Sequence, residues 1–145
     1  MLHQSLGPYR IERRLAAGGM AEVFVASRLG PHGFEKRLAL KRILPQHARD
    51  PEFVGMFIDE ARIAALLQHA NIVQIFDLGK HDDTFFIAME YISGRDVRLI
   101  IDKFRKQKKV MPVAMACFIM ARMAEGLDYA HRKADNQGQA LGLIH

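Results

Sequence analysis

The 145-residue sequence contains a single cysteine, Cys117, and no tryptophan. One cysteine excludes an internal disulfide and is typical of a reducing, cytoplasmic compartment, and we expect Cys117 to be a small buried apolar residue. Residues 1–8 lack the basic start and following apolar run of a secretory signal. No apolar run approaches the length that crosses a bilayer, so no membrane segment is expected in this chain.

A concentrated block of one charge is largely missing as well. The 21 basic residues are dispersed among 16 acidic ones, for a net charge of +5, which gives modest support for phosphate ligands and weak support for nucleic acid. The one basic run, 103–109, has a single aromatic residue and is interpreted as a solvated loop between helices. We therefore expect no nucleic-acid partner, although a basic nucleic-acid-binding domain stays an alternative that salt-dependent binding would test.

What the sequence does contain is a glycine pair, Gly18 and Gly19, between two β-rich segments, about 9–15 and 22–28. This pattern predicts a hairpin with the glycines at its turn. Glycine lets a backbone lie close over a phosphate chain and adopt dihedrals that other residues resist. An ordinary Gly-Gly turn is the alternative. A dinucleotide-binding fold is rejected, because its glycines open a helix rather than a strand.

A third strand is predicted at about 37–43. Leu38 and Leu40 then point to one face, and Ala39 and Lys41 to the other. A small residue beside a lysine suits a site that holds a flat ring near Ala39 and a phosphate near Lys41. An exposed lysine on an edge strand is the alternative.

The following helix is predicted from Asp50 and Pro51, an N-cap followed by proline in the first turn, to about Leu67. Glu60 would project from the middle of its apolar face, where an isolated charge costs several kcal/mol and needs a cation such as Lys41. A glutamate reaching solvent from the edge of that face is the alternative. At about 100° per residue, the apolar side chains within about 60° of Glu60 are Phe53, Met56, Phe57, Ile63, Ala64 and Leu67.

Two more strands, about 72–78 and 84–89, joined by a polar loop at 79–83, complete a sheet of five antiparallel strands with one helix, an α+β arrangement. A short helix is predicted at 97–104. A long helix opened by Pro112 runs to about His131, with apolar residues almost all round, and we expect it to be buried in a larger body with its methionines as core.

In this order the motifs resemble the amino-terminal half of a bacterial serine/threonine protein kinase domain. The family's glycine loop, Gly-x-Gly-x-x-Gly-x-Val, aligns on Ala16, Gly18, Ala21 and Val23, and its Val-Ala-Ile-Lys strand on residues 38–41. Alanine replaces two of the three loop glycines, a departure that leaves room for weakened nucleotide affinity.

Residues 69–73 resemble the kinase sequence His-Pro-Asn-Ile-Val, with alanine in place of proline, and His69 is expected to be structural. After a polar turn at 131–139, His145 fits the first residue of the His-Arg-Asp catalytic loop. The resemblance implies a kinase N-lobe, a hinge and the first helices of a truncated, mainly helical C-lobe. The expected divisions are an arm at 1–8, the N-lobe at 9–89, the hinge at 90–96 and the start of the C-lobe at 97–145.

The resemblance also implies the site. Lys41 would hold nucleotide phosphates and Glu60 would position Lys41, which makes them the catalytic pair of this chain. Met89 would be the gatekeeper, the Glu90 carbonyl and the Ile92 backbone would contact adenine, and Asp96 could accept from the ribose hydroxyls. The implied nucleotide-binding residues are Leu15, Ala16, Ala17, Gly18, Gly19, Met20, Ala21, Val23, Ala39, Lys41, Met89, Glu90, Ile92 and Asp96.

The implied reaction is transfer of the γ-phosphoryl group of MgATP to a hydroxyl of a protein substrate, with serine or threonine preferred over tyrosine on resemblance alone. The magnesium ligands and the catalytic aspartate of the family would lie beyond residue 145, so we expect the chain alone to bind ATP weakly and to be inactive. A non-catalytic pseudokinase or regulatory interaction module is the alternative.

Overall fold

The computed structural model describes residues 5–134 and 138–143. The chain forms two compact units. Unit 1 runs through Gln68 and includes Val73–Ile92, whereas unit 2 consists of His69–Ile72 and the chain from Ser93 onward.

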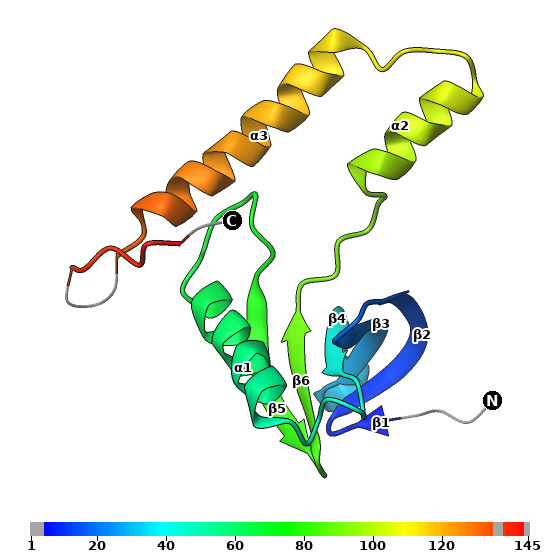
Figure 1. The fold of residues 1–145 in the computed structure, drawn as a ribbon. Helices are drawn as coiled ribbons and strands as arrows, with labels where there is room; N and C mark the ends of the chain where they lie inside the picture. Colours follow the sequence, from blue (N-terminus) through cyan, green and yellow to red (C-terminus); the bar gives the residue numbers. More distant parts are fainter. Residues whose placement is uncertain (1–4, 135–137, 144–145) are drawn as a thin grey trace. The chain divides into compact units, whose positions relative to one another are not determined.

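Unit 1 contains a six-stranded antiparallel sheet in the order β1-β2-β3-β4-β6-β5 (Figure 1). The five predicted strands are present, and the sixth, β1 (Ser5–Leu6), belongs to the segment predicted as a loose arm. Leu6 pairs with Tyr9 across a turn in which Gly7 has a φ of 57°. A two-residue strand is too short to give an alternating pattern, which is why the sequence analysis missed it. Residues 1–4 of the predicted arm lie outside the described residues. The other strands are β2 (Tyr9–Ala17), β3 (Ala21–Leu29), β4 (Glu35–Ile43), β5 (Ile75–His81) and β6 (Thr84–Met89).

The position of β5 differs from the prediction at both ends. It begins at Ile75 rather than at residue 72, because residues 69–72 form a closed turn in which the Ile72 amide donates to the His69 carbonyl at 3.0 Å. It also continues through most of the predicted loop, since His81 pairs with Thr84 across a turn of two residues, the first of which has a positive φ of 51°.

The two faces of the sheet bury separate clusters, as the alternation in β4 predicted. Leu38 and Leu40 belong to the cluster on one face, and Ile43 belongs to the cluster on the other. The second cluster is completed by helix α1 (Pro51–Ala65), whose Phe57 and Ala61 are buried. Within the described part of the chain no helix contributes to the first cluster, whose buried residues are Leu6, Tyr9, Ala26, Leu38, Leu40, Phe86 and Ala88.

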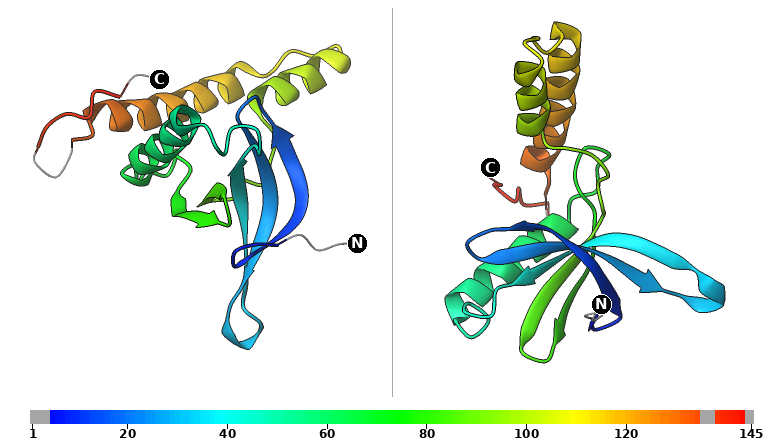
Figure 2. Two further views of the ribbon diagram at one scale, coloured as in Figure 1. Left: turned by 60° about the horizontal axis from the view of Figure 1, so that its bottom comes forward. Right: turned by 90° about the vertical axis from the view of Figure 1, so that its right-hand side faces the viewer.

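The sheet covers that first face by curling, which Figure 2 shows from two directions. The Tyr9 hydroxyl on β2 donates to Asp77 Oδ2 on β5 at 3.1 Å, although three strands lie between β2 and β5 in the sheet. Four strand spacings in a flat sheet would be about 19 Å, a distance that no tyrosine spans. The Tyr9 ring also lies edge-on to Phe86, with centroids 5.5 Å apart.

Unit 2 contains α2 (Val97–Lys106), α3 (Val113–Arg132) and the turn 69–72. The Asn71 side chain donates to Glu125 Oε2 at 3.1 Å, and a Cβ added to Gly126 would lie 3.3 Å from the Asn71 carbonyl oxygen, so the turn lies close on α3. Among the described residues, no helix is both long enough and apolar enough to cross a membrane.

Cys117 and the basic run 103–109 both belong to unit 2. Cys117 lies on α3 and is exposed, although the sequence predicted a buried residue. Within the described part of the chain, Gly126 is the one residue that α3 buries. The predicted role of His145 lies outside the described residues, as do positions 135–137 of the predicted polar turn. The basic run begins in the last turn of α2, where Lys103, Arg105 and Lys106 lie at the negative end of the helix dipole.

Candidate functional site

The antiparallel register of unit 1 brings most of the predicted site residues into adjacent positions. Ala16 on β2 pairs with Val23 on β3, and Val23 pairs with Lys41 on β4. Two residues back along β4, Ala39 pairs with Met89, the last residue of β6. Side chains at alternate positions of a strand share a face, so Ala39 and Lys41 line the same side of β4.

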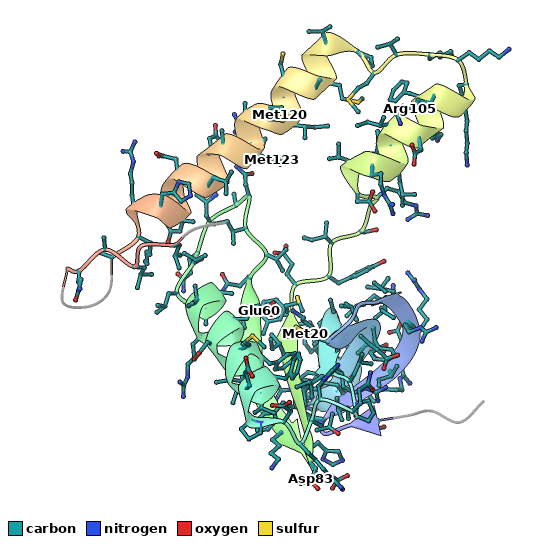
Figure 3. The ribbon with its side chains drawn as sticks, viewed as in Figure 1. Met20, Glu60, Asp83, Arg105, Met120 and Met123 are labelled. Carbon is teal, nitrogen blue, oxygen red and sulfur yellow. The ribbon has the colours of Figure 1, made fainter. Side chains whose placement is uncertain are left out.

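Lys41 and Glu60 form the ion pair that the sequence predicted. The Lys41 ammonium lies 2.5 Å from Glu60 Oε1 and 2.6 Å from Oε2, and its nitrogen is 5.7 Å from the centroid of the buried Phe57 ring. One ammonium held by both carboxylate oxygens has a fixed direction, because the contact restrains a flexible four-carbon stem. Figure 3 shows Glu60 on α1.

Glu60 lies at the edge of the buried stripe of α1, not in its middle as the sequence analysis expected. Its side chain is 53% exposed, against 23% for Lys41, and the buried stripe centres on Phe57 and Ala61. Met56 and Ile63, which were expected to share that stripe, are exposed. The helix presents a narrower face to β5 and β6 than periodicity suggested, so Glu60 contacts Lys41 at the rim of the core.

The β2–β3 hairpin turns through Gly18, Gly19 and Met20, and Figure 3 labels Met20. Neither glycine has a positive φ, and a Cβ on Gly19 would meet nothing within 4 Å. The Gly18 amide closes the hairpin by donating to the Ala21 carbonyl at 2.8 Å. The amides of Gly19 and Met20 donate no backbone hydrogen bond within the residues that the structure describes. The turn therefore holds two backbone donors and no side-chain obstruction at Gly19.

Leu15 is the extra residue of a β-bulge, since the pairing of β2 with β3 shifts between Arg14 and Ala16. A bulge redirects the side chains on either side of it. Leu15 is 40% exposed, whereas Val23 is part-buried and Ala39 is buried. Leu15 therefore presents apolar surface to solvent and is not part of a closed core.

The segment after β6 is only partly joined to this site. The Glu90 amide donates to the Gln74 carbonyl at 2.9 Å, and the Tyr91 hydroxyl accepts from Arg13 of β2 at 3.2 Å. Ile92 is exposed. Asp96 belongs to unit 2, where it is the N-cap of α2 and accepts from the Leu99 amide at 2.8 Å. A capping carboxylate of this kind was not recognised from the sequence.

The sequence model described as protein kinase domain matches residues 9–135. The chain belongs to the protein kinase family. Its relatives include the tyrosine-protein kinase MasK of Myxococcus xanthus, at 42% identity over 99% of this chain and 22% of that protein. The serine/threonine-protein kinase PknJ of Mycobacterium tuberculosis is 35% identical over 94% of this chain and 20% of that protein.

Solved protein kinases share the fold as well. The crystal structure of the Mycobacterium tuberculosis PknI kinase domain matches with a TM-score of 0.69 at 32% identity, covering 90% of this chain and 50% of that one. The chain thus spans about a fifth of the length of these curated relatives and half of a solved kinase domain. The predicted resemblance and the fold class are confirmed.

The structure of this kinase chain adds one group that sequence reasoning missed. Glu22, on β3 beside Val23, accepts from Arg42 at 2.9 Å and from Arg14 at 3.2 Å. The hydrogen bond from Arg42 is the main cause that lowers the pKa of the Glu22 carboxyl. Arg14, Glu22 and Arg42 therefore tie β2, β3 and β4 together next to the tip of the hairpin. The register of β3 against β4 predicts the contact of Glu22 with Arg42, because a register that places Val23 opposite Lys41 also places Glu22 opposite Arg42.

A metal site is not assigned in this chain. Among the described residues, no group of three or more histidine, cysteine, aspartate or glutamate side chains could hold a metal ion. The site presents one restrained ammonium, two backbone amides and the exposed apolar side chain of Leu15. That donor set fits a phosphate chain joined to a flat ring.

Proposed function

We propose that this chain forms the nucleotide-binding half of a protein kinase that transfers the γ-phosphoryl group of MgATP to a serine or threonine hydroxyl of a protein. In that transfer the substrate oxygen bonds to the γ-phosphorus, the bond from the γ-phosphorus to the β-phosphate oxygen breaks and releases ADP, and the hydroxyl proton would pass to the family's catalytic aspartate. Magnesium would neutralise the charge of the phosphates when bound. The observation that carries the proposal is the two-oxygen contact of Lys41 with Glu60 next to the open hairpin turn.

The energetics of that contact support a positioning role. A half-exposed ion pair contributes only about 0–1 kcal/mol to folding stability. Its main effect is therefore to hold the Lys41 ammonium in one direction, where it would meet nucleotide phosphates. The turn Gly18–Met20 would cover those phosphates with its amides, together with the flanking Ala16, Ala17 and Ala21.

The remaining site residues receive proposed roles by the family resemblance. Leu15, Val23 and Ala39 would enclose the adenine ring, and Met89 would be the gatekeeper beside it. The Glu90 carbonyl and the Ile92 backbone would contact the adenine edge, in a hinge proposed at residues 90–96. The change of compact unit between Ile92 and Ser93 supports a hinge there. Asp96 caps α2 through Oδ1, and its second carboxylate oxygen would accept from a ribose hydroxyl.

Nucleotide binding tests the proposal. A fluorescent ATP analogue should bind the wild-type chain saturably in the presence of magnesium, and Lys41→Met should weaken binding by at least about tenfold, because a charge-assisted contact is lost. Glu60→Gln should weaken it less, since the ammonium stays but loses its restraint. Lys36→Met, a change at an exposed lysine of the same strand, is the matched control and should bind as wild type.

Circular dichroism must show that each variant is folded. A folded wild-type chain that binds no nucleotide, or a Lys41→Met chain that binds as well as wild type, would contradict the proposal and favour a non-catalytic interaction module. The choice of hydroxyl needs a separate measurement, because the relatives include proteins named for serine/threonine and for tyrosine. Phosphoamino-acid analysis of a substrate phosphorylated by the full-length product of the gene should give phosphoserine or phosphothreonine.

A further inference from the structure

A histidine outside the predicted site contacts the tip of the β2–β3 hairpin. His47 lies in the turn between β4 and α1, and its Nε2 is 3.0 Å from the Gly19 carbonyl oxygen. A carbonyl oxygen can only accept, so Nε2 carries the proton and donates. The neutral tautomer protonated at Nε2 and the imidazolium both satisfy this contact.

His47 is itself held by its backbone and by its ring. Its backbone amide donates to the Leu44 carbonyl at 2.9 Å, and its backbone carbonyl accepts from the Asp50 amide at 3.1 Å. Its ring lies against Phe53 in the first turn of α1, with centroids 4.2 Å apart and planes inclined by 34°. The donor that reaches Gly19 is therefore held by the helix start as well as by the turn.

The same turn holds the next carbonyl of the hairpin too. The Leu44 amide donates to the Met20 carbonyl oxygen at 2.9 Å. Two successive carbonyls of the hairpin tip, those of Gly19 and Met20, are thus directed at the segment between β4 and α1.

The contact of His47 with the Gly19 carbonyl determines where the Met20 amide points. The described chain has no cis peptide bonds, and in a trans peptide the carbonyl and the following N–H point in opposite directions. Fixing the Gly19 carbonyl on His47 therefore turns the Met20 N–H away from that turn, and this amide has no backbone acceptor among the described residues. We propose that His47 is a positioning residue that holds the Met20 amide ready to donate to a nucleotide phosphate.

The inference rests on the proposed nucleotide site, and it adds a second link between α1 and the bound phosphates. Glu60 reaches them through Lys41, and Phe53 reaches them through His47 and Gly19. The two links differ in what they present, a charge in one case and a backbone amide in the other.

The test compares ligands with and without phosphates. His47→Phe keeps an aromatic ring against Phe53 but removes the donor, so affinity for a fluorescent ATP analogue should fall about three- to tenfold, the effect of one hydrogen bond. Affinity for the equally labelled adenosine should not change. His47→Gln offers a side-chain donor again and should recover part of the loss. His131→Phe, the same change at an exposed histidine of α3, is the control.

Hydrogen exchange without nucleotide gives the second readout, because His47→Phe should speed exchange at the hairpin tip. Equal ATP-analogue affinity of His47→Phe and wild type, while Lys41→Met is weakened, would overturn this inference and leave the proposed function standing. An equal loss for the ATP analogue and for adenosine would also overturn it, by showing a general structural role. Absence of binding by the wild-type chain would overturn both.

Discussion

Gly18 and Gly19 adopt backbone conformations that an alanine could also adopt. Neither has a positive φ, and the space around Gly19 is open. Glycine at these two positions is therefore not required by the fold of the hairpin. Under the proposed function, glycine at these positions would let the bare backbone lie against a phosphate chain that approaches the turn from outside.

Gly19→Ala separates these two explanations. We expect the free energy of unfolding to change by less than about 0.5 kcal/mol, because nothing lies where the methyl group would go. Affinity for the fluorescent ATP analogue should nevertheless fall. Denaturant unfolding and binding titrations on the same protein measure the two effects, and a large loss of stability or an unchanged affinity would argue against the explanation.

Gly79→Ala provides the contrast for that measurement. A Cβ there would lie 2.3 Å from Phe86 Cζ, and the Phe86 ring is buried against Tyr9. Overpacking of this kind costs about 1–3 kcal/mol, so Gly79→Ala should destabilise the chain. One glycine is thus explained by its contacts within the fold and the other is not.

Among the elements, β2 and β5 are joined across the curled sheet by Tyr9 and Asp77. Burial, and then the nearby Asp77 carboxylate, raise the pKa of the Tyr9 hydroxyl above its usual value. The native state therefore holds this proton more tightly than the unfolded state. The resulting stability is complete below a pH of about 10 and is lost as the pH rises through the raised pKa of the folded chain.

Tyr9→Phe should remove this dependence. At neutral pH we expect a loss of about 0.5–1.5 kcal/mol in the free energy of unfolding, the net contribution of one hydrogen bond. Above pH 10 the wild type should lose stability more steeply than the variant, so the two curves converge. Urea unfolding followed by circular dichroism at several pH values measures both. Parallel curves for the two proteins would show that Tyr9 does not titrate as described.

Helix α1 shows what an element contributes to a site at its edge. Asp50 accepts from the Glu52 amide at 3.0 Å and Pro51 occupies the first turn, so the start of the helix is fixed as the sequence predicted. The cap fixes where the helix begins, and the packing of Phe57 and Ala61 against the sheet fixes its rotation about the axis. The cap and the packing together determine which side chains face β4 and the hairpin.

At the scale of the whole molecule, unit 2 exposes much of the apolar surface of its helices. Val113, Phe118 and Met120 of α3 are among its most exposed large apolar side chains, and Figure 3 labels Met120 and Met123. The sequence predicted a helix buried in a larger body, and among the described residues α3 buries Gly126 alone. Exposed apolar surface of this extent is typical of a surface that another part or protein covers.

We therefore expect the isolated chain to self-associate. Sedimentation velocity over a range of concentrations should show species larger than the monomer, and Phe118→Gln combined with Met120→Lys should shift the distribution toward the monomer. Lys36→Met serves as a control, because β4 lies in unit 1. A monodisperse wild-type monomer at high concentration would contradict the prediction.

The sequence by itself determined the order of the five predicted strands and three helices, the N-cap of α1, and the pairing of Lys41 with Glu60. These features depend on alternation, on turn residues and on a charge that needs a partner, all of which are local patterns. The functional roles of the remaining site residues stay predictions.

Only the tertiary structure decided the features that depend on curvature and on contacts between distant segments. The curl that brings Tyr9 to Asp77, the shift of β5 to begin at Ile75, and the placement of Glu60 at the rim of the core all arise from packing. His47 gave no sequence signal, because a single histidine in a turn has no periodicity and its partner is a backbone carbonyl. A backbone atom has the same chemistry at every position, so only its location in the fold shows that it is contacted.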